Sequence, residues 1–174
     1  IGGEPGSTQS ALIMPVAGDE TIFYIFTTQQ VHGSNTYELR YSLYDLKLNN
    51  GNGGLVEYNK LLFTRSTERI TGNGQWMIAH EYGNNSFRAY PISTTGIGNP
   101  VISSLGSDHL LTEELNGQGY MELTGNLLAL ALSTSPTNNA LEIFDFVDTT
   151  GVVTNFRRLD LNTTSGQVYG VEIS

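Results

Sequence analysis

The fold is decided by TIFYIFT at residues 21–27 and by two similar apolar stretches, QWMIAHE at residues 75–81 and NLLALAL at residues 126–132. Each stretch is short and almost continuously apolar, as expected for a strand that is covered on both faces. The stretches lie about 50 residues apart, and a spacing of that length is typical of repeat architectures. They therefore predict three copies of one β unit.

A second pattern follows each stretch after a polar turn, and it reads LYDL at residues 43–46, AYPI at residues 89–92 and IFDF at residues 143–146. Clusters rich in Asn, Gly and Thr come next, at residues 49–54, 93–96 and 148–151. Asn and Gly readily adopt the positive φ angles that tight turns need. The clusters therefore predict hairpin connections.

Each unit also has an opening strand, expected at residues 9–16, 68–73 and 119–124, and a closing strand, expected at residues 55–64, 101–106 and 155–161. Four antiparallel strands in a unit that recurs about every 50 residues are the signature of β-propeller blades. We therefore predict an all-β chain that forms a partial β-propeller. It has about three four-stranded blades, with approximate boundaries at residues 9–64, 66–106 and 118–161.

Residues 168–174 are predicted to form the opening strand of a fourth blade, because GQVYGVEI at residues 166–173 is similar to GQGYMEL at residues 117–123. About twelve short strands would also suit a β-sandwich. The co-linear match of three units favours the propeller. Since propellers typically close with about four to eight blades, further blades are expected from the parent chain or from another copy.

Composition and charge limit the classes of partner that the chain is expected to bind. The 174 residues are 39% hydrophobic and only 14% charged, and the formal net charge is −9. Nucleic-acid affinity rests largely on Lys and Arg, and the chain has only 8 of them, so no nucleic-acid partner is expected. No apolar run is long enough to predict a membrane span. Cysteine is absent, which excludes disulfides and thiolate chemistry.

His80 and Glu81 are the first candidates for ligand contact, because His80 lies in a predicted inner strand. They begin a string typical of zinc proteases, but Asn84 stands where the second histidine would be required. A strand would also direct the two side chains to opposite faces. We therefore expect no metal site. His80 is interpreted as a hydrogen-bonded structural residue, with a ligand contact at the rim or channel as the alternative.

Glu122 and Glu172 are the other candidates, because they occupy similar positions in successive opening strands. Such positions suit carboxylates on the central axis of a propeller, where an enzyme would gather polar residues from several blades. Arg69 or Thr71 falls near the equivalent position of the second unit, so the set is not uniform.

Four aromatic residues could form a stacking platform for a glycan if they reached a rim of the propeller: Trp76, Tyr82, Phe87 and Tyr90. At strand spacing these side chains suit core packing between blades better. The sequence has no G-x-S-x-G elbow, no G-x-G-x-x-G fingerprint and no P-loop. Hydrolysis by a nucleophile on a G-x-S-x-G elbow and nucleotide binding are therefore not expected, and no cofactor is expected.

Several segments resemble the YVTN or WD40-like propellers of large Bacteroidetes surface proteins: WMIAHE at 76–81, FRAY at 87–90, GYMEL at 119–123, LEIFDF at 141–146 and YGVEIS at 169–174. The resemblance covers nearly the whole chain. The Ser-Pro-Asp-Gly turn of such repeats is replaced by LTGN at residues 123–126. Such proteins often carry a sorting domain for type IX secretion. The resemblance therefore implies an extracellular or cell-surface location and no fixed activity.

Together these features predict a non-catalytic propeller module of a secreted or cell-surface protein that binds or scaffolds a protein or glycan partner at its blade loops. Two alternatives stay open. One is a lactonase-like propeller hydrolase with an axial polar site, which predicts inward-facing acids and histidines near the openings of several units. The other is a structural spacer within a long adhesin.

Overall fold

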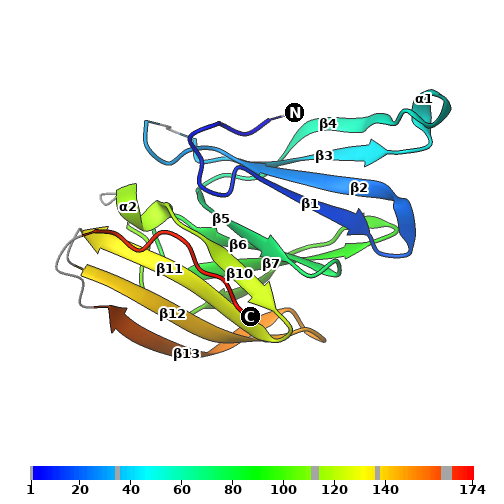
Figure 1. Ribbon diagram of the computed structural model, residues 1–174. Coiled ribbons are helices and arrows are strands. Elements are labelled where there is room, and N and C mark those ends of the chain that lie inside the picture. The colour runs from blue at the N-terminus through cyan, green and yellow to red at the C-terminus, as the bar shows by residue number, and fades with distance from the viewer. Residues whose placement is uncertain (1, 34–35, 111–113, 136–137, 162–165) are drawn as a thin grey trace.

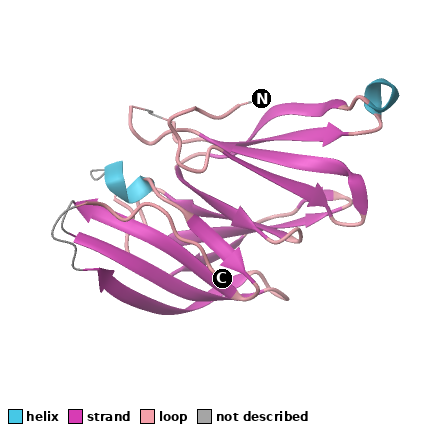
Figure 2. Cartoon of the chain, in the orientation of Figure 1, coloured by secondary structure: helices cyan, strands magenta, loops and turns pink. Residues whose placement is uncertain are grey.

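The computed structural model describes residues 2–33, 36–110, 114–135, 138–161 and 166–174. Over these ranges the chain is almost entirely β, with two helices of 4 residues each (Figure 2). The strands build three antiparallel sheets that follow one another along the chain (Figure 1). The prediction of an all-β chain is confirmed. Neither of the described helices is long and apolar enough to cross a membrane.

The first sheet has the strand order β1-β2-β3-β4 and consists of β1 (Ala11–Val16), β2 (Asp19–Thr28), β3 (Leu39–Asp45) and β4 (Gly54–Phe63). A short helix, α1 (Leu48–Gly51), joins β3 to β4. Within α1, Asn49 and Asn50 adopt φ angles of 51° and 58°. Asn tolerates this left-handed region better than most residues, which explains the Asn-rich turn in the sequence.

The second sheet contains β5 (Ser66–Gly72), β6 (Trp76–Glu81), β7 (Ser86–Ser93), β8 (Gly96–Ile97) and β9 (Val101–Ser104). Strands β5, β6 and β7 pair in sequence order, and both β8 and β9 pair with the outer side of β7. The outer position is therefore shared by two short strands rather than held by the one predicted at residues 101–106. Pro100 lies between them and has no N–H to donate to the ladder.

The third sheet has the order β10-β11-β12-β13 and consists of β10 (Met121–Thr124), β11 (Leu127–Ser135), β12 (Asn138–Val147) and β13 (Val152–Leu161). A second short helix, α2 (Glu114–Gly117), precedes β10. Each of the three sheets lies within one of the predicted units, at residues 9–64, 66–106 and 118–161.

The second sheet lies between the other two (Figure 1), and an apolar core fills each space. Toward the first sheet the core includes Phe26, Leu39 and Met77. Toward the third sheet it includes Phe87 and Phe144, whose ring centroids lie 4.9 Å apart. Burial of such a side chain contributes roughly 1.5–3 kcal/mol, so these two cores are the main stabilising contacts between the sheets.

A bulge interrupts β5, whose buried polar side chains contact both neighbouring sheets. Ser66 pairs with Glu81 and Ile70 pairs with Ala79, so residues 67–69 of β5 stand against a single residue of β6. Every residue from Ser66 to Thr71 is buried. Because consecutive side chains of a strand point to opposite faces, neighbouring residues of β5 reach both adjacent sheets.

Residues 168–174 are not a strand, which differs from the prediction. This C-terminal segment runs beside β10 (Figure 1), and it accepts a backbone hydrogen bond of 2.8 Å from the N–H of Tyr120 at the oxygen of Tyr169. A strand needs a ladder of such bonds with a neighbour. The segment has the apolar pattern of an opening strand, but among the described residues it lacks a paired strand of its own.

Candidate functional site

The opening strands of the three sheets meet, because β5 contacts both β1 and β10. A pocket of about 350 Å³ opens beside them, and the C-terminal segment forms part of its wall. We call it the inner-strand pocket, and its lining includes Leu12, Ile70, Met121, Glu122 and Glu172. Residues far apart in sequence thus line one cavity.

Gln9 ties the opening strands together at this pocket. Its Oε1 accepts hydrogen bonds from the N–H of Ile70 at 3.2 Å and of Met121 at 2.9 Å, and its Nε2 donates to the oxygen of Met121 at 3.1 Å. One amide therefore uses both its acceptor and its donor group to bridge the second and third sheets from the start of the first. No local sequence signal marks Gln9 for this role.

The structure brings Glu122 and Glu172 to the inner-strand pocket in different environments. Glu122 is half-buried, and its Oε2 accepts a hydrogen bond of 3.1 Å from the N–H of Ile173. Glu172 is exposed to solvent. The pocket therefore holds one carboxylate that is fixed by the C-terminal segment and one that is free to hydrate.

His80 and Glu81 lie elsewhere and do not share a site with these carboxylates. His80 is buried, and its Nδ1 lies 2.7 Å from the oxygen of Glu81, which agrees with a structural role. Burial lowers the pKa of His80 to about 3, so the ring is neutral. The Glu81 carboxylate accepts hydrogen bonds from Arg88 at 2.5 Å and from Asn84 at 2.6 Å. Glu81 is therefore committed to contacts within its own sheet.

His109 was not a candidate from sequence, yet it is fully buried against His80. The two imidazole rings stack with centroids 3.7 Å apart. Backbone bonds hold the His109 loop in place, because His109 N–H donates to the oxygen of Asn84 and Gly83 N–H donates to the oxygen of His109. Burial, with His80 and Arg69 nearby, holds the pKa of His109 well below its ordinary value.

The sequence analysis placed Arg69 only near the axial set and did not predict its structural role, yet its guanidinium is completely buried. It donates to the backbone oxygens of Ala131 at 2.7 Å and of Asn116 at 2.5 Å, and to the oxygen of Gln118. Desolvation lowers its pKa to about 10, so it stays charged at neutral pH. With its donors used on carbonyl groups, Arg69 fixes α2 and β11 rather than a ligand.

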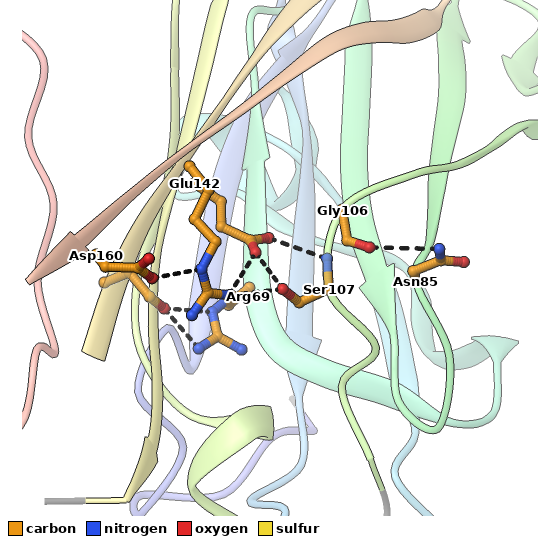
Figure 3. Close-up of polar contacts among 8 residues, drawn as sticks. Arg69, Asn85, Gly106, Ser107, Glu142 and Asp160 are labelled. Carbon is orange, nitrogen blue, oxygen red and sulfur yellow. Dashed lines mark hydrogen bonds and ion pairs between the residues drawn. The ribbon is translucent and has the colours of Figure 1, made fainter. Parts of the chain in front are cut away.

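Two buried carboxylates complete this polar interior. Glu68 accepts hydrogen bonds from the backbone N–H groups of Thr8 at 2.6 Å and of Val31 at 2.8 Å. Glu142 accepts from the hydroxyl of Ser107 and pairs with Arg158 at 3.3 Å. Figure 3 shows Glu142 next to Ser107, with Arg69 close by. These groups are paired inside the protein, as buried charges must be.

Two adjoining hollows of about 570 and 510 Å³ lie at one end of the second and third sheets. Both are lined by turns that join neighbouring strands, and both include Asp148 and Thr149, so they form one surface feature. We call it the turn-end groove. Trp76 lines the hollow at the second sheet, and Asp145 and Asn155 line the hollow at the third sheet.

Three of the four aromatic candidates belong to the interior, because Tyr82 and Phe87 are 0% exposed and Tyr90 is 4% exposed. Trp76 is half-buried and reaches the turn-end groove. The indole Nε1 donates to the oxygen of Asp148 at 2.7 Å. The stacking platform that the sequence suggested is therefore reduced to one aromatic residue.

The part of the chain that the structure describes holds no group of three or more His, Asp or Glu side chains able to bind a metal ion. No protein-family model matches the sequence, and no curated protein matches it. The resemblance to YVTN or WD40-like propellers therefore stays a prediction.

Proposed function

We propose that this chain is a non-catalytic β-propeller module of a secreted or cell-surface protein, and that its blade loops bind a protein or glycan partner. The observation that carries the proposal is the meeting of the three opening strands around Gln9. In a propeller, four-stranded sheets surround a central channel, and the opening strand of each sheet lies nearest to it. Consecutive sheets that share an apolar core face to face also support this arrangement.

One face of the first sheet supports the presence of further blades. Turned away from the second sheet, it exposes Ile13 at 64%, Leu61 at 48% and Leu55 at 39%. The equivalent space between described sheets is filled by apolar contacts. We propose that a further blade, from the parent chain or from another copy, covers this face. Light scattering separates these sources, since a discrete dimer supports another copy and a monomer supports the parent chain.

A second candidate function is hydrolysis at the inner-strand pocket by a lactonase-like propeller. Glu122 and Glu172 favour it, because they line one pocket in different environments. General acid and base catalysis requires such a difference between two carboxyl groups. Glu122 is already engaged by Ile173, which favours a structural role for it.

A paired binding and turnover experiment tests the proposal. Fluorescently labelled chain is incubated with bacterial and animal cells and with a glycan array, while aliquots are incubated with lactone and p-nitrophenyl ester substrates. We expect saturable binding without turnover. Turnover that is lost in Glu122→Gln and retained in the control Glu57→Gln would contradict a non-catalytic module and support the hydrolase.

Location is tested separately on the source cells. We expect protease treatment of intact cells, or analysis of the culture medium, to reach the protein. Protection in intact cells and digestion only after lysis would contradict a secreted or cell-surface location.

A further inference from the structure

The turn-end groove has the size and composition of a ligand site. Its two hollows of about 570 and 510 Å³ lie within the range of roughly 300–1,000 Å³ that is typical of small-molecule sites. They adjoin at Asp148 and Thr149, so an extended ligand can cross from the third sheet to the second. A chain of several linked units suits this shape better than a single compact molecule.

The polar groups of the groove match a ligand rich in hydroxyl groups. The carboxylates of Asp145 and Asp148 accept hydrogen bonds, and the amides of Asn126 and Asn155 both donate and accept. Among the described residues that line the groove there is no Lys, Arg or His. This composition opposes anionic ligands, and the net charge of −9 adds to the repulsion.

The aromatic and apolar surfaces of the groove supply the other half of the recognition. Trp76 lines one hollow together with Pro91. The indole is fixed by its bond to the oxygen of Asp148 and by an edge contact with Phe146, at a centroid distance of 5.9 Å. A ring held in place loses little entropy when a ligand packs on it.

The carboxylates are also held in fixed positions before any ligand arrives. Asp145 accepts hydrogen bonds from Asn155 at 2.7 Å and from Arg157 at 2.5 Å, and these bonds lower its pKa. Asp148 accepts a bond of 2.7 Å from Asn73 across the second and third sheets. Each carboxylate keeps further acceptor capacity, because an ionised carboxylate has about four lone-pair sites.

We propose that the turn-end groove binds a neutral glycan. This proposal rests on the proposed binding function and names the ligand class of that function. Sugar hydroxyl groups donate to Asp145 and Asp148, and the amide of Asn126 bonds further hydroxyl groups. An apolar face of one sugar ring packs on Trp76. A basic peptide is the competing ligand, since it would also fit two carboxylates.

Substitution at the centre of the groove tests the assignment. Thr149 is exposed and lines both hollows, so Thr149→Trp fills the groove without disturbing the core. Thr150 is also exposed but lines neither hollow, so Thr150→Trp is the matched control. Asp148→Asn keeps the acceptor for Asn73 and removes the charge.

The probes are immobilised neutral hexasaccharides of glucose, mannose and xylose, with polygalacturonate as the anionic control and oligolysine as the cationic competitor. We expect binding of at least one neutral hexasaccharide. The affinity for that hexasaccharide should fall at least about tenfold in Thr149→Trp. It should fall about tenfold in Asp148→Asn, because that variant loses one hydrogen bond to a charged group. Thr150→Trp should bind as the native chain does.

Three outcomes would overturn the assignment: no binding of a neutral hexasaccharide by folded chain, equal binding by Thr149→Trp, or selective and salt-sensitive binding of oligolysine. If no neutral hexasaccharide binds but a protein partner binds saturably, the assignment is overturned while the proposed binding function stands. Lactone or ester turnover would instead contradict the proposed function.

Discussion

The second sheet contacts its two neighbours through adjacent residues of opposite charge. Toward the first sheet, the Glu68 carboxylate accepts hydrogen bonds from the N–H groups of Thr8 and Val31. Toward the third sheet, the Arg69 guanidinium donates to backbone oxygens of α2 and β11, Ala131 among them. Consecutive side chains of a strand point to opposite faces, so Glu68 and Arg69 of β5 reach opposite neighbours. We call this pair the β5 clamp.

Among the described residues, the interface with the third sheet buries more ionisable side chains than the interface with the first sheet. Besides Arg69 it buries the stacked rings of His80 and His109, whereas the interface with the first sheet has Glu68 as its buried charge among the described contacts. Buried basic groups must stay paired or neutral. The third-sheet interface should therefore respond more strongly to charge removal and to acid than the first-sheet interface.

The largest effect is expected from Arg69→Met. Methionine removes every donor while the carbonyl oxygens that Arg69 binds stay buried. Unpaired buried acceptors cost about 1–3 kcal/mol each, so the free energy of unfolding should fall by about 4 kcal/mol. Urea denaturation measures it. Arg157→Met at an exposed ion pair is the control and should cost less than about 1 kcal/mol. Equal losses in the two variants would contradict the clamp.

Acid should be the next largest perturbation, acting at the third-sheet interface. Burial lowers the pKa of His80 to about 3 and that of His109 well below its ordinary value. The unfolded chain, with ordinary histidine pKa values near 6.5, therefore binds protons first. The free energy of unfolding keeps its full value above about pH 6.5. It falls toward pH 3, by up to about 1.4 kcal/mol per pH unit for each histidine.

Urea denaturation at several pH values between 7 and 5 checks this slope. His109→Phe keeps an aromatic ring against His80 and removes one titrating group, so the slope should fall by about half. A slope that His109→Phe does not alter would show that other groups dominate the acid response.

A smaller loss is expected at the first-sheet interface from Glu68→Gln. The amide of glutamine keeps one acceptor but turns an NH₂ group toward the N–H of Thr8 or Val31. One lost bond to a charged acceptor should cost about 2 kcal/mol in urea denaturation. Glu172→Gln, at an exposed residue, should be neutral. A cost above that of Arg69→Met would reverse the order of the two interfaces.

The smallest effect is expected from Ser107→Ala beside Glu142. The variant removes one hydroxyl donor, but Arg158 still pairs with the carboxylate. We expect a loss of about 1 kcal/mol in thermal or urea denaturation. The control Ser93→Ala removes a hydroxyl whose bonds to Thr95 and Gly96 lie in an exposed turn, so it should cost less than Ser107→Ala. A loss of about 3 kcal/mol or more would mean that Arg158 does not stabilise Glu142 without Ser107.

The strands could be predicted because their signals are local. Continuous apolar runs marked β2, β6 and β11, and clusters of Asn and Gly marked the turns, so the sequence indicated an all-β chain. The strand predicted at residues 168–174 had the same local pattern. Pairing depends on a neighbour, which no local pattern supplies, and the segment makes one backbone bond from Tyr120 instead.

The candidate sites were predicted less well because burial of charge depends on distant groups. Arg69 binds the carbonyl of Ala131, which lies 62 residues away, and nothing near Arg69 in the sequence signals that partner. His109 sits in a polar loop, where an exposed side chain is the usual expectation. Glu122 and Glu172 both line the inner-strand pocket, but they do not come from successive opening strands, because residues 168–174 form no strand.

Native-state hydrogen exchange of the native chain and of Arg69→Met tests the central claim most directly. If the β5 clamp joins three sheets into one unit, the slowest amides of β2, β6 and β11 should share one opening free energy, and Arg69→Met should lower it in all three. A variant in which β11 loses its protection while β2 keeps the native value would contradict this account, because the first sheet would then fold independently of the third.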